Sequence, residues 1–159
     1  MKKLFFLLMF PLLMITSCKD NAEKANNSNN ITETVSKEML LEQEIKAFNE
    51  QLPIQVDEAT TLLSMFKDEE YVIYEYSVDE NDMDFKQFIE HKEEFRNNIK
   101  NYIISKSTPD SELYAFMSLV RDTGNNLRYQ YIGNKSGKAT IFEFSNDDLK
   151  EMITDFDKN

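Results

Sequence analysis

The sequence predicts an α+β fold: a four-stranded antiparallel sheet made of two hairpins, with helices packed on one face. Two pairs of short segments alternate in side-chain character with a period of two, which is typical of strands. Around them, apolar residues recur every three or four positions, which predicts helices. The predicted order is helix, hairpin, two helices, hairpin, helix (α-ββ-αα-ββ-α), and a sheet covered on one face is the simplest layered arrangement for it.

The first predicted helix begins at Thr32 and ends before Pro53. Its apolar stripe comprises Val35, Met39, Leu41, Ile45, Phe48 and Leu52. Two strands follow, 59–66 and 71–78, joined by a polar turn. The second strand has two alternating sets of residues: Val72, Tyr74, Tyr76 and Val78 in one, and Tyr71, Ile73, Glu75 and Ser77 in the other. We expect the first set to face the helices.

A second long helix is predicted to start at Asp82 or Asp84. Its apolar side comprises Phe85, Phe88, Ile89, Phe95, Ile99 and Ile103. A shorter helix is predicted to start at Ser107 or Pro109 and to stop at Gly124.

The second predicted hairpin joins strands 127–132 and 139–144 across the turn 133–137. The polar run 145–148 then caps a last helix, whose apolar residues are Leu149, Met152, Ile153 and Phe156.

Residues 1–17 are predicted to be a signal peptide, with a basic start, an apolar run of about a dozen residues and small side chains at the end. The run is too short to span a membrane, which takes roughly 20 apolar residues. The stretch Ile15-Thr16-Ser17-Cys18 resembles the lipobox of bacterial lipoproteins. That resemblance implies that Cys18 is lipidated, with palmitate among its acyl chains, and becomes the first residue after cleavage.

The same resemblance implies a cell-envelope protein that the lipid on Cys18 anchors to a membrane. We expect the outer membrane, on either its periplasmic or its surface side. Residues 18–31 are polar and rich in asparagine, so we expect a flexible tether after the anchor. A single domain then follows at 32–157, large enough for a packed core.

The charge of the chain constrains its partners. Cleavage before Cys18 lowers the 18 basic residues to 16 and leaves the 29 acidic residues, which changes the formal charge from −11 to −13. Such an acidic chain is not expected to bind nucleic acid, which needs basic surface to displace counterions. A basic protein partner is the one that this charge favours.

Few residue patterns support catalysis. Cys18 is the only cysteine and His91 the only histidine, which excludes thiolate sites and multi-histidine zinc sites within the folded domain. The segment 133–138 is too short for a phosphate-binding loop and precedes a strand rather than a helix. The acidic run 79–84 lacks the fifth and sixth residues of a helix-loop-helix calcium site. We therefore expect no metal ion, no cofactor and no enzymatic activity.

A second resemblance covers much of the mature domain. It rests on Leu52-Pro53, Asp57, Thr60, Leu62, Tyr74-x-Tyr76, Gly124, Tyr129-x-Tyr131 and Gly137. This pattern is similar to one shared by small secreted bacterial proteins without an assigned function. The resemblance implies no activity and no site residue.

Two functional hypotheses remain. The favoured one is a non-catalytic envelope module that binds a protein or a ligand, for instance as an inhibitor or immunity-type lipoprotein. The alternative is a small carboxylate-based hydrolase acting on an envelope polymer, because the many acids can supply a facing pair. Tyr71, Tyr129 and Tyr131 form the candidate binding face, since tyrosines stack on ligands, although alternating aromatic residues on strands also pack in cores.

Overall fold

The computed structural model describes residues 29–153 and confirms the α+β class. The elements are α1 (Asn29–Asn49), β1 (Ile54–Gln55), β2 (Thr60–Lys67), β3 (Tyr71–Val78), α2 (Lys86–Glu90), α3 (Lys92–Lys106), α4 (Glu112–Asp122), β4 (Asn126–Gly133), β5 (Ala139–Phe144) and α5 (Asn146–Met152). The expected signal peptide at 1–17, Cys18 and most of the expected tether lie outside the described residues. Helix α1 begins at Asn29 rather than at Thr32.

The sheet differs from the predicted one in two respects. It has five strands in the order β1-β2-β3-β4-β5, and β3 and β4 run parallel, with Tyr71 opposite Asn126 and Val78 opposite Gly133. The prediction of four antiparallel strands is therefore wrong, although β2–β3 and β4–β5 are antiparallel pairs as expected. The cause is the long connection through α2, α3 and α4, which carries the chain back to the starting end of β3. Such a crossover is what parallel pairing requires.

The additional strand, β1, is only two residues long. Ile54 pairs with Leu62, and Gln55 pairs with Thr61. Two residues are too few for an alternating pattern, so no sequence signal marked this strand.

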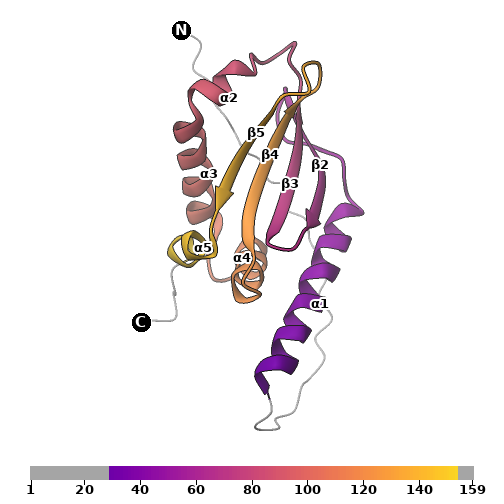
Figure 1. Cartoon of the computed structure of the whole chain (residues 1–159), viewed down its shortest axis with the longest axis vertical. Coiled ribbons are helices and arrows are strands. Elements are labelled where there is room, and N and C mark those ends of the chain that lie inside the picture. Colours follow the sequence, from indigo (N-terminus) through magenta and orange to yellow (C-terminus); the bar gives the residue numbers. More distant parts are fainter. Residues whose placement is uncertain (1–28, 154–159) are drawn as a thin grey trace.

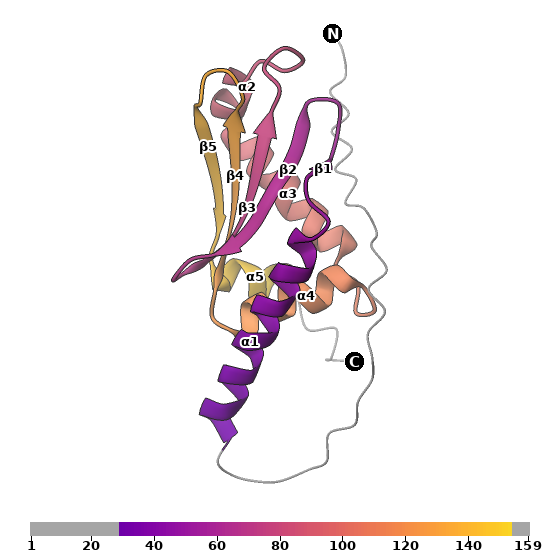
Figure 2. The same cartoon turned by 90° about the vertical axis from the view of Figure 1, so that its right-hand side faces the viewer.

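The helices cover one face of the sheet. Figure 2 shows α2 and α3 behind the long strands, and Figure 1 shows α3 on the β5 side, α4 and α5 at the lower end of the sheet, and α1 extending downward from the β2 side. As expected, Val72, Tyr74 and Tyr76 face these helices and are buried. Each helix adds buried side chains to the same core: Leu41 and Ile45, Phe88, Ile99 and Ile103, Met117 and Val120, and Leu149 and Met152.

The predicted second long helix is two helices. The chain turns at His91, where φ is −110° and ψ is 31°, between α2 and α3. This turn resets the helical phase, so Phe88 stays buried while Ile89 is 54% exposed rather than part of the apolar side. Met39, expected in the stripe of α1, is also exposed, because α1 contacts the body along Leu41 and Ile45.

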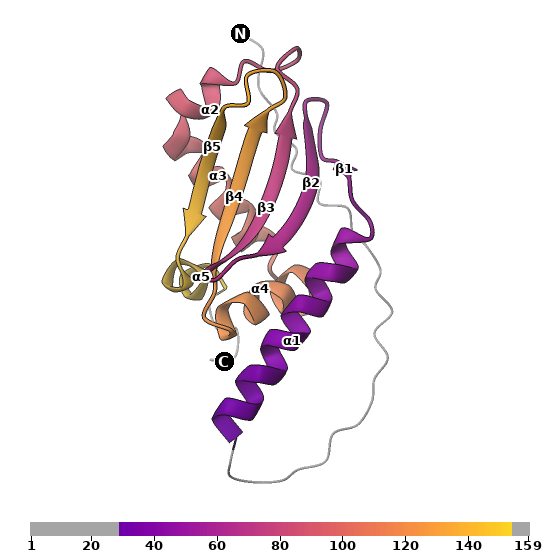
Figure 3. The ribbon, with the colours of Figure 1, turned by 45° about the vertical axis from the view of Figure 1, so that its right-hand side comes forward.

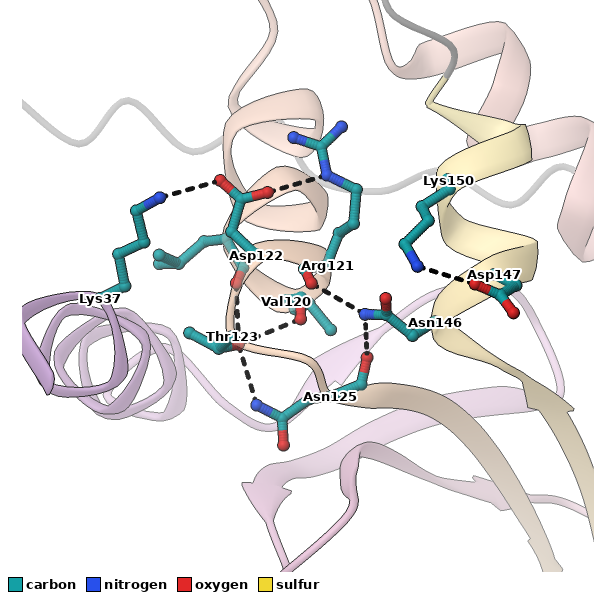
Figure 4. Close-up of polar contacts among 10 residues, drawn as sticks. Lys37, Val120, Arg121, Asp122, Thr123, Asn125, Asn146, Asp147 and Lys150 are labelled. Carbon is teal, nitrogen blue, oxygen red and sulfur yellow. Dashed lines mark hydrogen bonds and ion pairs between the residues drawn. The ribbon is translucent and has the colours of Figure 1, made fainter. Parts of the chain in front are cut away.

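A set of hydrogen bonds and an ion pair surrounds the start of β4 (Figure 4). The side-chain amide of Asn146 donates to the backbone oxygens of Arg121, at 2.8 Å, and Asn125, at 3.0 Å. Lys37 of α1 pairs with Asp122 at 3.4 Å. The N–H of Asn146 also donates to Oδ1 of Asn126 at 2.8 Å, so the end of α4 and the start of α5 are tied to the first residue of β4.

Candidate protein-binding surface

The sheet has a second face that the helices do not cover, called the outer face below (Figure 3). The strand register places its residues in three rows across β2, β3, β4 and β5: Phe66, Ile73, Arg128 and Glu143; Ser64, Glu75, Gln130 and Ile141; and Thr61, Ser77, Ile132 and Ala139. Successive side chains of a strand point to opposite faces, so these rows alternate with the buried core residues.

Two large apolar side chains of β2 are exposed, and the strand register places one of them, Phe66, on this face. Phe66 is 40% exposed. Leu63, the residue left unpaired at the bulge between Leu62 and Ser64, is 43% exposed. Ile73 is only 3% exposed, because its row neighbours flank it on both sides. An exposed apolar side chain on a sheet face that no described helix covers is available for contact with a partner.

A charged cluster lies beside the apolar residues. The guanidinium carbon of Arg128 is 4.0 Å from the ring centroid of Tyr71, a cation–π geometry. Arg128 also pairs with Glu143, with 2.8 Å between Nη2 and Oε1, and lies 3.8 Å from the Oδ2 atom of Asp68. The N–H groups of Glu70 and Tyr71 lower the pKa of Asp68, and the charge of Arg128 lowers it further. Arg128 of β4 thus links three strands, β3, β4 and β5, and the turn at Asp68.

The three tyrosines of the predicted binding face do not share a surface. Tyr71 lies on the outer face, half-buried beside Arg128, whereas Tyr129 and Tyr131 point into the core. Tyr129 stacks on Tyr74 with 5.1 Å between ring centroids, and Tyr131 stacks on Tyr76 at 4.6 Å.

Burial raises the pKa values of the hydroxyls of Tyr129 and Tyr131. The alternating aromatic residues of β4 therefore act as packing residues. The structure gives the outer face two members that sequence reasoning missed, Phe66 and Arg128. In the sequence, each of these two residues belongs to an alternating strand pattern. That pattern does not show that they share a face with Tyr71 and Ile73 until the strand pairing is known.

The segments compared with metal and phosphate sites form a loop contact. Glu80 accepts hydrogen bonds from the backbone N–H groups of Lys135, at 2.8 Å, and Ser136, at 2.6 Å. Gly133 leaves room for this carboxylate, because a Cβ there would lie 2.8 Å from its carbon. The loop 133–137 thus holds an acid instead of cradling a phosphate.

His91 is exposed, with Nδ1 3.7 Å from Oε2 of Glu94. Within residues 29–153, no cluster of three His, Cys, Asp or Glu side chains is arranged to hold a metal ion. No helix in that same range is long and apolar enough to cross a membrane.

The comparisons with known proteins concern the fold. No family model and no curated protein matches the chain. A crystal structure of a candidate secreted protein from Pseudomonas aeruginosa is similar, with a TM-score of 0.57 and 12% identity, over 74% of this chain and 96% of that one. The two therefore share a fold.

Two type 2 secretion pilotins give lower scores. The pilotin of Vibrio vulnificus has a TM-score of 0.49 and 10% identity over 76% of this chain and 97% of its own. The pilotin of Vibrio cholerae has a TM-score of 0.46 and 11% identity over 74% and 97%.

Proposed function

We propose that the protein is a lipid-anchored envelope module that binds another protein through the outer face of its sheet. The observation that carries the proposal is the exposure of Phe66 on a sheet face that no described helix covers, next to the Arg128 cluster, with Leu63 also exposed at the bulge of the same strand. An apolar patch bordered by charged groups is the usual composition of a protein-binding surface.

The charges of the outer face indicate the kind of partner. Glu75, Glu143 and the adjacent Asp68 are acidic, and Arg128 is basic. Since the chain without residues 1–17 is also acidic, with a formal charge of −13, a partner with apolar and basic side chains is the complementary one.

Four carboxylates of the described chain take part in structural contacts. The pKa values of Asp68, Asp79, Glu80 and Asp148 are lowered. Glycoside hydrolysis needs one carboxyl group with a raised pKa as the general acid, a role that none of these four fits. Hydrogen bonds from backbone N–H groups stabilise these carboxylates, which suits structural roles.

The test compares two charged substitutions of exposed apolar residues. Phe66→Glu places a charge on the outer face, and Ile89→Glu places the same charge on α2, away from the sheet. Lipidated wild type and both variants are cross-linked in intact envelopes and recovered, and the captured proteins are quantified by mass spectrometry. We expect one partner to fall about tenfold with Phe66→Glu, as for a central interface residue, and to stay unchanged with Ile89→Glu. Equal capture by all three chains would contradict the use of the outer face.

A further inference from the structure

The two edges of the sheet differ in how their backbone groups are covered. On the β2 side, β1 pairs with Thr61 and Leu62. Further along that edge, the side-chain amide of Asn49 accepts from the N–H of Met65 at 2.9 Å and donates to its C=O. A strand, a side chain and a bulge thus close this edge, in the way that natural sheets prevent pairing with other chains.

The β5 edge is left open by comparison. Arg96 donates from Nε to the backbone oxygen of Glu143 at 3.2 Å, which shows that the peptide groups of Glu143 point away from β4. In an antiparallel strand, alternate residues point the same way, so the N–H and C=O groups of Ala139 and Ile141 point outward as well. Within residues 29–153, Arg96 is the only side chain that hydrogen-bonds a backbone group of β5.

Apart from Arg96 and the charge of Glu143, strand β5 has few of the features that protect an edge. Its sequence, Ala-Thr-Ile-Phe-Glu-Phe, contains no proline and no lysine. Its pairing with β4 runs without a register shift from Ile132–Ala139 to Leu127–Phe144. Flat edges of strand-forming residues are the ones that add a further strand.

We propose that β5 is a strand-addition site, which takes an extended segment of a partner protein with alternating apolar and basic residues. The inference rests on the proposed function, because its occupant is the same partner. On the outer face, side chains of the added strand would lie beside Ile141 and Glu143, where a lysine or arginine can pair with Oε2 of Glu143, since Arg128 bonds Oε1. On the opposite face, the alternate side chains would lie beside Phe142, which favours apolar residues. A second copy of the chain is a poorer occupant, because two chains of formal charge −13 after removal of residues 1–17 repel one another.

The experiment uses a defined peptide as the probe. The mature lipidated protein in a non-ionic detergent is titrated with a fluorescent peptide of alternating valine and lysine, about six residues long as in an average strand. Its control alternates valine and glutamate. We expect the lysine peptide to bind at least about tenfold more tightly and to slow hydrogen exchange at the Ala139 and Ile141 amides by at least about tenfold. Exchange at the Tyr129 amide, inside the sheet, is the internal reference.

Variants of Ile141 separate backbone pairing from side-chain contact. Ile141→Pro removes the outward N–H and should weaken the lysine peptide by about tenfold or more, whereas Ile141→Thr keeps the N–H and should bind nearly as wild type. The exchange measurement on wild type does not depend on the folding of either variant. Absence of binding, or binding without slower exchange at Ala139 and Ile141, overturns the inference.

The two proposals fail separately. If β5 stays unprotected but Phe66→Glu still loses its cross-linked partner, strand addition is wrong and the outer face remains the binding surface. If the peptide protects β5 but Phe66→Glu captures its partner as wild type does, strand addition stands and the outer-face proposal is wrong.

Discussion

The side chain of Asn49 bonds both backbone groups of Met65, so a residue at the end of α1 takes the place of a neighbouring strand. The N–H of Met65 donates to Oδ1 of Asn49 at 2.9 Å, and Nδ2 of Asn49 donates to the C=O of Met65. The same Nδ2 atom also donates to the carbonyl of Ile45 at 2.9 Å. Asn49 therefore ties the last turn of α1 to β2 just beyond the short β1.

Asn49→Ala should lower the free energy of unfolding by about 1–3 kcal/mol, because it leaves the partly buried N–H and C=O of Met65 without their partner. Asn101→Ala on the exposed side of α3 is the matched control and should change stability by less than about 0.5 kcal/mol. Urea midpoints of the two variants test this. An Asn49→Ala midpoint equal to that of the control would show that water replaces the amide at no cost.

Two tyrosines on opposite faces of β3 should differ in how much their substitution lowers stability. Tyr74 lies in the core, in contact with the rings of Phe48, Phe116 and Tyr129. Tyr74→Ala should therefore cost on the order of 3–5 kcal/mol. Tyr71→Ala removes the ring under Arg128 on the outer face and should cost only about 0.5–1 kcal/mol.

Denaturant unfolding of both tyrosine variants measures this difference. His91→Ala serves as a third variant. Because His91 is exposed, this substitution should lower the free energy of unfolding by less than about 1 kcal/mol. A Tyr74→Ala variant as stable as wild type would contradict the assignment of the two faces.

The local elements of the fold were predictable from the sequence. The alternation of apolar and polar residues in β3 predicted which side chains face the core, because successive side chains of a strand point to opposite faces. Ser145 accepts a bond from the N–H of Asp148 and forms a capping box with it, in the predicted polar run. Gly124, with φ at 76°, follows the C-cap residue Thr123 of α4, the position where helix ends favour glycine.

The arrangement of the two hairpins was not predictable from these patterns. The parallel pairing of β3 with β4 depends on the path of residues 79–125, and no local pattern encodes that path. The pairing places Tyr129 beside Tyr74 and Tyr131 beside Tyr76, which is why the predicted binding tyrosines are core residues. It also places Arg128 beside Ile73, so the outer face is a product of long-range pairing.

The lipid anchor is a prediction from the sequence at residues that the structure does not describe. Cys18→Ala should abolish incorporation of labelled palmitate and move the protein out of the membrane fraction, because Cys18 is the only acceptor in the lipobox-like stretch. Cys18→Ser is the conservative control and should give the same loss. Unchanged labelling in either variant would contradict the lipoprotein assignment.

Glu80 predicts how stability depends on pH. Hydrogen bonds from the N–H groups of Ser136 and Lys135 lower its pKa below the ordinary 4.5. A carboxyl group with a lowered folded-state pKa stabilises the fold above its unfolded pKa, and this contribution is lost as the pH falls through the folded value. Wild type should therefore lose stability as the pH falls below about 4.5, and Glu80→Gln should lose less over the same range.

The control is Glu69→Gln, which removes an equal charge from an exposed side chain that accepts no hydrogen bond within the described chain. Urea midpoints at neutral pH and at several values below pH 4.5 give the slope for each protein. We expect Glu69→Gln to follow the wild-type slope, and Glu80→Gln to start lower at neutral pH and to converge on wild type in acid. Parallel curves for wild type and Glu80→Gln would mean that the loop contact at Lys135 and Ser136 does not depend on the charge of this carboxylate.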